Sequence, residues 1–333
     1  KRLDRQGASL ATSNWARALA ALALLAAAPA TARELEGQVA LTFDDLPALT
    51  IETNQGYIDD LNRDLLRKLR ENHVPAIGFV NESKAEGAEH DRQVDNLKRW
   101  LDAGMLLGNH TFSHSSPNSL GAAAYAADIE RGERITRPLM KAHGKKLRWF
   151  RHPYLEAGSP LAVRDWINRW LRDHGYRVAP VTIDAEDWEF AEPYDDAIAK
   201  HDVARQARIR QTYLAYTAMR IKWSQESAKA LFGRDIAHIM LLHCTRLNAD
   251  TLDALLKLLR TARLRPVTID QAMRDRAYRT RDTYAEKDGV TWLERWAATL
   301  GKTLPSEGDE DPPAEIQAEY DRVDKDRASP QNQ

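Results

Sequence analysis

The chain has 333 residues, of which 43% are hydrophobic and 29% are charged. Its 48 Lys and Arg residues nearly balance its 49 Asp and Glu residues, and no basic stripe with interleaved aromatic residues is present. This charge pattern argues against nucleic acid as a partner and favours a neutral or mixed-charge substrate. The only cysteine, Cys244, cannot form an internal disulfide.

Residues 1–32 have the order of a secretory signal. Four basic residues precede an apolar run over residues 18–28, and small residues follow as far as Ala30 and Ala32. The run is shorter than the about 20 residues that span a bilayer. We therefore expect a signal peptide cleaved near Ala30 or Ala32, a periplasmic or extracellular protein, and no membrane span after cleavage. An uncleaved anchor is the alternative.

From residue 38 onward, short apolar runs alternate with longer amphipathic stretches, which is typical of βα units around a parallel sheet. The runs predict seven strands, over residues 39–43, 76–80, 105–109, 147–151, 177–183, 236–242 and 265–269. Helices are predicted over residues 57–71, 91–103, 122–142, 160–174 and 249–262. Seven such repeats favour a distorted α/β barrel over an open sheet, and a barrel of this length can be a single domain.

Three regions are predicted to stand apart from these repeats. Within the barrel domain, residues 33–281, the charged stretch 189–235 predicts a long helical insertion. Residues 282–303 predict a helical extension, in which Trp292 and Trp296 have helical spacing and are expected to pack the helix on the barrel. Residues 304–333 are rich in Pro, Glu and Asp without an apolar period, so a disordered or loosely attached tail is expected there.

The polar clusters of the sequence follow the predicted strands, whose ends share one face in a βα barrel. Asp44 and Asp45 end the first strand, where two buried carboxylates repel each other unless a cation holds them. A turn capped by Asp45 is the alternative. His110 and His114 close the third strand, and on a helical turn this spacing directs both imidazoles at one ion. Two imidazoles and a carboxylate are a normal ligand set for catalytic zinc.

Three further clusters follow the fourth, fifth and sixth strands. Arg151 is a permanent cation that can pair with a carboxylate and stabilise its ionised form. Asp184 and Asp187 follow the fifth strand, and His243 ends the sixth. A carboxylate bonded to this imidazole would raise its proton affinity and fix its orientation.

Taken together, the clusters resemble the motifs of the polysaccharide deacetylases of carbohydrate esterase family 4, the NodB-homology proteins. They occur in the family's order as Thr-Phe-Asp-Asp at 42–45, His-Thr-Phe-Ser-His at 110–114, Arg-His-Pro-Tyr at 151–154, Asp-x-x-Asp-Trp at 184–188 and Leu-x-His at 241–243. The resemblance spans roughly residues 38–275 and implies a distorted, TIM-like barrel with fewer than eight strands. It implies a metal-dependent hydrolase that removes N-acetyl groups from an aminosugar polymer, peptidoglycan-like or chitin-like.

The resemblance also implies roles for individual residues. Asp44 is expected to be the catalytic base and His243 the general acid, with Arg151 holding Asp44 ionised. Asp187 is the first choice to orient His243, and Asp184 the second. The metal ligands are expected to be Asp45, His110 and His114, and the metal zinc, with cobalt or another divalent ion as the alternative. The substrate is expected to contact Pro153, Tyr154, Trp188 and Leu241, and the backbone N–H near Tyr154 is implied as a donor to the oxyanion.

Two other functions fit the same residues. An O-acetyl esterase acting on an acetylated glycan such as xylan could use the same metal and base. A catalytically silent glycan-binding barrel is the second alternative, although binding alone requires neither Asp44 nor His243. Residues 154–158 and the long insertion depart from the commoner family members, and both are expected to shape the substrate groove.

Overall fold

The computed structural model describes residues 37–324. The predicted signal peptide and residues 325–333 lie outside the described residues. Within the described part, no helix has both the length and the apolar character needed to cross a membrane.

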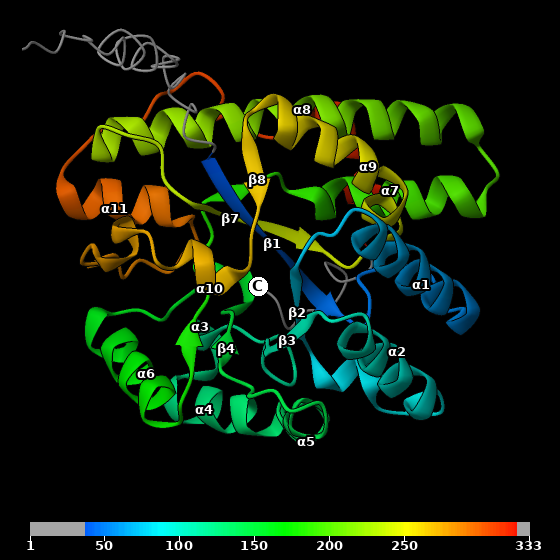
Figure 1. Cartoon of the computed structure of the whole chain (residues 1–333), viewed down its shortest axis with the longest axis horizontal. Coiled ribbons are helices and arrows are strands. Elements are labelled where there is room, and N and C mark those ends of the chain that lie inside the picture. The colour runs from blue at the N-terminus through cyan, green and yellow to red at the C-terminus, as the bar shows by residue number, and fades with distance from the viewer. Residues whose placement is uncertain (1–36, 325–333) are drawn as a thin grey trace, which may run out of the picture. The chain divides into compact units, whose positions relative to one another are not determined.

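Eight parallel strands form one curled sheet, in which β1 pairs with β2, β7 and β8 (Figure 1). Seven of them follow the order β5-β4-β3-β2-β1-β7-β6, and β8 pairs with the start of β1. No ladder joins the end strands β5 and β6 in the described part of the chain, so the barrel is incomplete. The predicted distorted α/β barrel is therefore confirmed. The strands are β1 Gly37–Leu46, β2 Ala76–Val80, β3 Leu106–Asn109, β4 Trp149–Phe150, β5 Arg177–Val178, β6 Ile183–Asp184, β7 His238–His243 and β8 Leu264–Pro266.

The predicted strand over residues 177–183 is in fact two short strands. β5 pairs with β4, whereas β6 pairs with β7 on the other side of the opening. Pro180 lies between them. Because proline has no backbone N–H to donate to a ladder, it breaks the run at the point where the chain crosses between the two ends of the sheet.

Twelve α-helices are present in the described residues, and those that follow the strands pack on the outer face of the sheet (Figure 1). α1 illustrates the cause, because Asn54 caps its first turn and Ile58, Leu61 and Leu65 form one buried stripe. The helices are α1 Gln55–Glu71, α2 His90–Asp102, α3 Pro117–Leu120, α4 Ala122–Arg131, α5 Thr136–Ala142, α6 Leu161–Asp173, α7 Asp187–Ala199, α8 Val203–Phe232, α9 Arg246–Thr261, α10 Ile269–Ala272, α11 Trp292–Leu300 and α12 Ala314–Val323. Three 3₁₀ turns, η1 Glu82–Ala85, η2 Pro153–Leu155 and η3 Arg276–Arg279, complete the set.

The predicted helix over residues 122–142 is divided into α4 and α5. Gly132 ends α4, and a Cβ built on it would lie 2.5 Å from the carbonyl carbon of Thr111. The loop that carries His110 and His114 therefore packs directly against the break between the two helices. A larger residue at position 132 would push this loop away.

The region predicted as a helical insertion contains α7 and the long helix α8. α11 falls in the predicted extension, where Trp296 is buried against Phe232 and Tyr278. Both regions thus contribute apolar side chains to the core.

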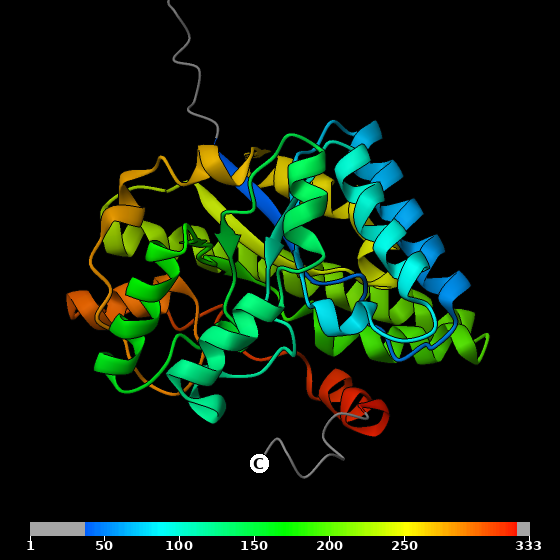
Figure 2. The same cartoon turned by 90° about the horizontal axis from the view of Figure 1, so that it is seen from below.

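The expected disorder of residues 304–324 is corrected by the structure. This segment ends in α12, which packs beside α7 and is red in Figure 2. Ile316 of α12 has no exposed surface and belongs to the main hydrophobic core, and Glu319 pairs with Arg205 and Arg208 of α8. The composition of this segment does not predict an ordered helix, because only one apolar residue and one carboxylate anchor it. The burial of Ile316 and Glu319 nevertheless holds α12 in place.

Alternation along β1 determines which of its side chains face the interior of the barrel. Leu41 and Phe43 join the core shared with the outer helices, whereas Ala40 joins the separate interior cluster. Because successive side chains of a strand point to opposite faces, Thr42 and Asp44 continue the inward-facing set. Asp44 pairs in register with His243 of β7, so the ladder places both residues at the same end of the barrel.

Candidate active site

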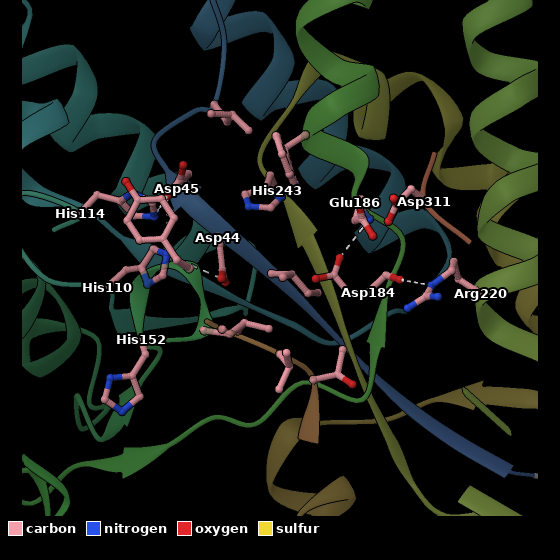
Figure 3. A pocket seen from close by; sticks show the side chains of 18 of the residues that line it. Asp44, Asp45, His110, His114, His152, Asp184, Glu186, Arg220, His243 and Asp311 are labelled. Carbon is pink, nitrogen blue, oxygen red and sulfur yellow. Dashed lines mark hydrogen bonds and ion pairs between the residues drawn. The ribbon is translucent and has the colours of Figure 1, made fainter. Parts of the chain in front are cut away.

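A cavity of about 850 Å³ lies at the carboxyl ends of the strands, and Figure 3 shows part of its lining. Nine of the twelve residues that the sequence proposed for the site line it: Asp44, Asp45, His110, His114, Tyr154, Asp184, Trp188, Leu241 and His243. Arg151, Pro153 and Asp187 are buried outside the lining. The strand ends therefore converge as expected for a βα barrel.

Asp45, His110 and His114 form a group that could hold a metal ion. One potential ligand atom from each residue lies within 4.8 Å of the other two. The Nε2 atoms of His110 and His114 are 3.6 Å and 3.4 Å from Oδ1 of Asp45. This oxygen is buried and accepts no hydrogen bond within the described residues. Because an orphaned carboxylate oxygen facing two imidazoles is costly without a cation, the three residues fit a divalent metal.

The protonation of the three residues also suits metal binding. Burial lowers the pKa of both His110 and His114 to about 4, so their imidazoles are neutral near pH 7. Burial by itself raises the pKa of Asp45, but His114 and Lys84 outweigh burial and hold the pKa below its ordinary value. Nδ1 of His110 is 2.9 Å from the carbonyl oxygen of Arg151 and donates to it, which leaves Nε2 as the free lone pair.

The two histidines converge by a different route from the predicted helical turn. Residues 110–116 are not helical, and Thr111 and His114 have positive φ angles of 65° and 57°. Two local hydrogen bonds hold this loop: Asn109 Oδ1 accepts from the N–H of Thr111 at 2.7 Å, and Thr111 Oγ1 accepts from the N–H of His114 at 3.0 Å. Side chains of loop residues thus replace the helical hydrogen bonds. Asp45 also has a positive φ, of 64°.

Arg151 fixes the carboxylate of Asp44. Its Nη1 lies 3.2 Å and 3.1 Å from the two oxygens of Asp44, while Nη2 donates to Thr42 and Nε to the carbonyl oxygen of Ala179. Burial nevertheless raises the pKa of Asp44 by more than the charge of Arg151 lowers it. The contact is as predicted, but Arg151 alone does not hold the pKa of Asp44 at its ordinary value.

His243 is oriented by Asp187, the first of the two predicted partners. Nδ1 of His243 is 2.7 Å from Oδ1 of Asp187, and Asn248 donates to the other oxygen of this carboxylate. Burial alone lowers the pKa of His243, but the charge of Asp187 outweighs it and raises the pKa to about 9. Asp184 instead accepts the backbone N–H of Glu186 at 2.9 Å.

The predicted substrate contacts occupy different positions. Tyr154 is 52% exposed, and its ring centroid lies 4.6 Å from that of His114. Trp188 packs edge-on against Tyr320, and Leu241 forms a small apolar patch with neighbouring side chains. Pro153 is buried at the start of η2 and lies outside the cavity lining. Its fixed φ shapes the turn that presents Tyr154.

Several residues of the site escaped the sequence analysis. Nζ of Lys84 is 3.2 Å from Oδ2 of Asp45, on the side of the carboxylate away from the histidines. Asn248 supports Asp187 from the first turn of α9. Glu186, Arg220 and the C-terminal residues Asp309, Asp311, Tyr320 and Asp324 also line the cavity. These contacts join distant parts of the chain and leave no local pattern in the sequence.

Comparisons with known proteins agree with this geometry. Residues 32–179 match the polysaccharide deacetylase family model, which includes the motifs at 42–45, 110–114 and 151–154. A chitin deacetylase from Colletotrichum lindemuthianum is 28% identical over 186 residues, which are 56% of this chain and 67% of the relative. A peptidoglycan-N-acetylglucosamine deacetylase from Bacillus cereus is 27% identical over 154 residues, which are 46% of this chain but only 47% of that relative.

Solved structures with similar backbones include a polysaccharide deacetylase from Bacillus cereus, with a TM-score of 0.49, 19% identity and coverage of 70% of this chain and 91% of that one. The chitin deacetylase from Colletotrichum lindemuthianum has a TM-score of 0.48 and 20% identity, with coverage of 71% and 87%. Residues 32–179 thus match the polysaccharide deacetylase family, and the three motifs within this range lie around one cavity.

Proposed function

We propose that this protein is a metal-dependent deacetylase that hydrolyses N-acetyl groups on an aminosugar glycan. The observation that carries the proposal is the pairing of Asp44 and His243 on adjacent strands, in the same cavity as the Asp45, His110 and His114 group. A base candidate and an acid candidate thus flank one group of potential metal ligands. Such an arrangement suits hydrolysis of an amide by water.

Asp45, His110 and His114 would hold the metal, for which we propose zinc because its catalytic sites commonly have such a ligand set. When bound, the metal would polarise the acetyl carbonyl and lower the pKa of the attacking water.

The protein's own residues would move the protons. Asp44 accepts a proton from the attacking water while Arg151 holds its carboxylate in place. His243 then protonates the departing amine nitrogen, and Asp187 keeps its imidazole oriented and its pKa raised. Without this proton, an amine leaves poorly. The backbone N–H near Tyr154, which the family resemblance implies, would donate to the oxyanion.

The lining of the cavity favours a neutral or cationic glycan. Its carboxylates outnumber its permanent cation Arg220; beyond Asp44 and Asp45 they are Asp184, Glu186, Glu192, Glu294, Asp309, Asp311 and Asp324. Burial raises the pKa of Glu186 to about 8 and Arg220 pairs with Asp309, but the remaining carboxylates would still disfavour an anionic glycan. Relatives named for chitin and for peptidoglycan N-acetylglucosamine deacetylation support an N-acetylated substrate. The signal-like sequence of residues 1–32 supports action outside the cytoplasm.

The test is acetate release from N-acetylglucosamine oligomers, peptidoglycan and acetylxylan. We expect release from the N-acetylated substrates, its loss after chelation and its return with zinc or cobalt. Asp44→Asn serves as the inactive control. Undiminished release by protein shown to be metal-free contradicts metal dependence. Release from acetylxylan alone identifies an O-acetyl esterase, and binding of glycan without release from any substrate identifies a silent binding protein.

A further inference from the structure

One end of the cavity is built by the C-terminal wall, which we define as residues 305–324. Asp309, Asp311, Tyr320 and Asp324 of this wall line the same cavity as Asp44 and His243. Figure 3 shows Asp311 beside Glu186, on the opposite side of His243 from the metal-ligand group. The cavity therefore extends from the metal-ligand group to the C-terminal wall.

The first half of the C-terminal wall is held by hydrogen bonds from side chains of α8. Arg220, only 6% exposed, donates through Nη1 to the carbonyl oxygen of Gly308 at 3.1 Å and to Asp309 Oδ1 at 3.0 Å. Its Nε donates to the backbone oxygen of Asp184, at the end of β6, at 3.1 Å. One guanidinium thus ties the wall to both the insertion and the barrel. The hydroxyl of Tyr216 adds a hydrogen bond of 3.0 Å to the carbonyl oxygen of Glu310.

The second half of the wall is anchored by α12. Ile316 is completely buried in the main core, and Glu319 pairs with Arg205 at 2.7 Å and with Arg208. Tyr320 packs edge-on against Trp188, with ring centroids 5.0 Å apart. These contacts make the wall a fixed part of the site rather than a loosely attached tail.

The opposite side of the cavity, around Tyr154 and His114, is accessible to solvent. Tyr154 is 52% exposed and His114 keeps a quarter of its side chain exposed, so the metal-ligand group is reached from this side. Glu186, Arg220 and the C-terminal wall line the same cavity as Tyr154, so a glycan that entered past Tyr154 would approach them. The cavity, at about 850 Å³, falls within the range of about 300–1,000 Å³ that encloses a small ligand.

We propose that the C-terminal wall makes the enzyme selective for short N-acetylated oligosaccharides and for the ends of longer chains. Deacetylation in the middle of a polymer requires room for the chain on both sides of the reacting sugar. The C-terminal wall occupies the space that the chain would need on one side. The reacting sugar therefore lies at or near a chain terminus. This inference rests on the proposed deacetylase function and names the substrate class that the same cavity admits.

The wild-type protein provides the first test. Hexamers of N-acetylglucosamine labelled at the reducing end are treated until about one acetyl group per chain is lost, and fragment masses then locate the free amine. We expect the free amine to be confined to the terminal region at one end of the chain. We also expect kcat/KM per acetyl group on a soluble N-acetylated polymer to be about tenfold lower than on the trimer. Equal loss from all six positions, with similar values for polymer and trimer, would overturn the proposal.

A variant that loosens the wall provides the second test. Glu319→Ala removes the ion pairs with Arg205 and Arg208 without altering a residue of the cavity lining. We expect faster hydrogen exchange in residues 314–323, a several-fold rise in the ratio of polymer to trimer kcat/KM, and free amines at internal positions. Asp275→Ala is the matched control, because it removes a partly buried ion pair, with Arg234, that lies away from the lining. It should leave the ratio unchanged.

The possible outcomes distinguish failure of the proposed selectivity from failure of the proposed deacetylase function. Faster exchange in α12 with an unchanged terminal pattern would show that the wall does not select the substrate. Absence of acetate release from trimer, hexamer and polymer alike would refute the proposed function instead. In that case, calorimetric binding of the same oligomers still tests the wall, and affinity that keeps rising from trimer to hexamer would overturn the proposal.

Discussion

The carboxylate of Asp187 accepts two hydrogen bonds from His243, one from the ring at Nδ1 and one from the backbone N–H, and both are 2.7 Å long. Asp187 has no exposed surface, and Asn248 donates to the same carboxylate oxygen as the backbone N–H. Ring and backbone are thus fixed to one anion. The imidazole cannot rotate without breaking a buried, charge-assisted hydrogen bond.

Replacing Asp187 by Asn should shift the pH profile of the reaction. The pKa of His243 is raised to about 9 by the charge of Asp187, so its protonated form persists until the pH rises through that value. In Asp187→Asn the pKa of His243 falls, so we expect the basic limb of the pH profile of kcat/KM to move to lower pH. We also expect kcat/KM to fall by about a hundredfold or more. The pH profile measures both. Asp184→Asn is the control, because its carboxylate bonds Glu186 instead; a shift in this variant alone would make Asp184 the orienting residue.

Replacing Asp44 and replacing Asp45 should have different effects on metal content and on rate. Asp45 directs a hydrogen-bond-free oxygen at the two histidines, so Asp45→Asn should lose the metal, as should His110→Ala. Asp44 is held by Arg151, so Asp44→Asn should keep the metal and lose about a hundred- to ten-thousand-fold in kcat. Elemental analysis of the purified variants decides. A metal-free Asp44→Asn beside a loaded Asp45→Asn would reverse the two assignments.

Gly289→Ala should damage the site through a steric clash. A Cβ at this position would lie 1.6 Å from the carbonyl oxygen of Tyr154, so either backbone must shift. We expect a destabilisation of about 1–3 kcal/mol together with a fall in kcat/KM, because Tyr154 packs on the ring of His114. Thermal unfolding and kinetics measure the two effects. The exposed neighbour provides the control Asp288→Ala, and equal behaviour of the two variants would exclude the clash.

Asp195 should give the stability of the protein a specific pH dependence. It is buried, accepts hydrogen bonds from Thr50 and Tyr57, and has its pKa raised to about 6 by burial. Between about pH 4 and 6 the unfolded chain has lost this proton while the folded chain retains it. Stability therefore falls as the pH rises through this window, by up to about 3 kcal/mol.

Urea unfolding of Asp195→Asn between pH 4 and 7 tests this dependence. The variant should lack the decline seen in the wild type. Asp275→Asn is the control, because the hydrogen bond from Arg234 outweighs burial and lowers the pKa of Asp275 to about 2. Its stabilising contribution is complete above about pH 4, so this variant should keep the wild-type slope. Parallel curves for the wild type and Asp195→Asn would contradict the role of Asp195.

The sequence predicted those features that depend on local patterns. Buried strands such as β2 and β7 are continuous apolar runs, and α1 shows its apolar stripe directly. Prediction from apolar patterns was wrong where a single residue changes the path of the chain. Pro180 splits a predicted strand, and Gly132 divides a predicted helix because it touches the backbone of Thr111.

The site residues that lie within sequence motifs were predictable. Asp45, His110 and His114 come together as expected, although a loop with positive φ angles replaces the predicted helical turn. Lys84 and Arg220 were missed, since each meets a partner far away in the sequence through a long side chain. No periodicity or spacing reports such contacts. For the same reason, α12 could not be distinguished from a disordered tail.

The left-handed backbone conformation of the loops that carry Asp45 and His114 lowers the stability of the protein. Asp45, Thr111 and His114 each have a φ near +60°, a conformation that costs a residue with a side chain about 1–2 kcal/mol and glycine almost nothing. A laboratory selection for heat resistance alone would therefore favour glycine at these three positions and remove Asp45 and His114, two of the three candidate metal ligands. Evolution toward a hardier enzyme has to gain its stability elsewhere, while the strain in these loops is retained as a condition of catalysis.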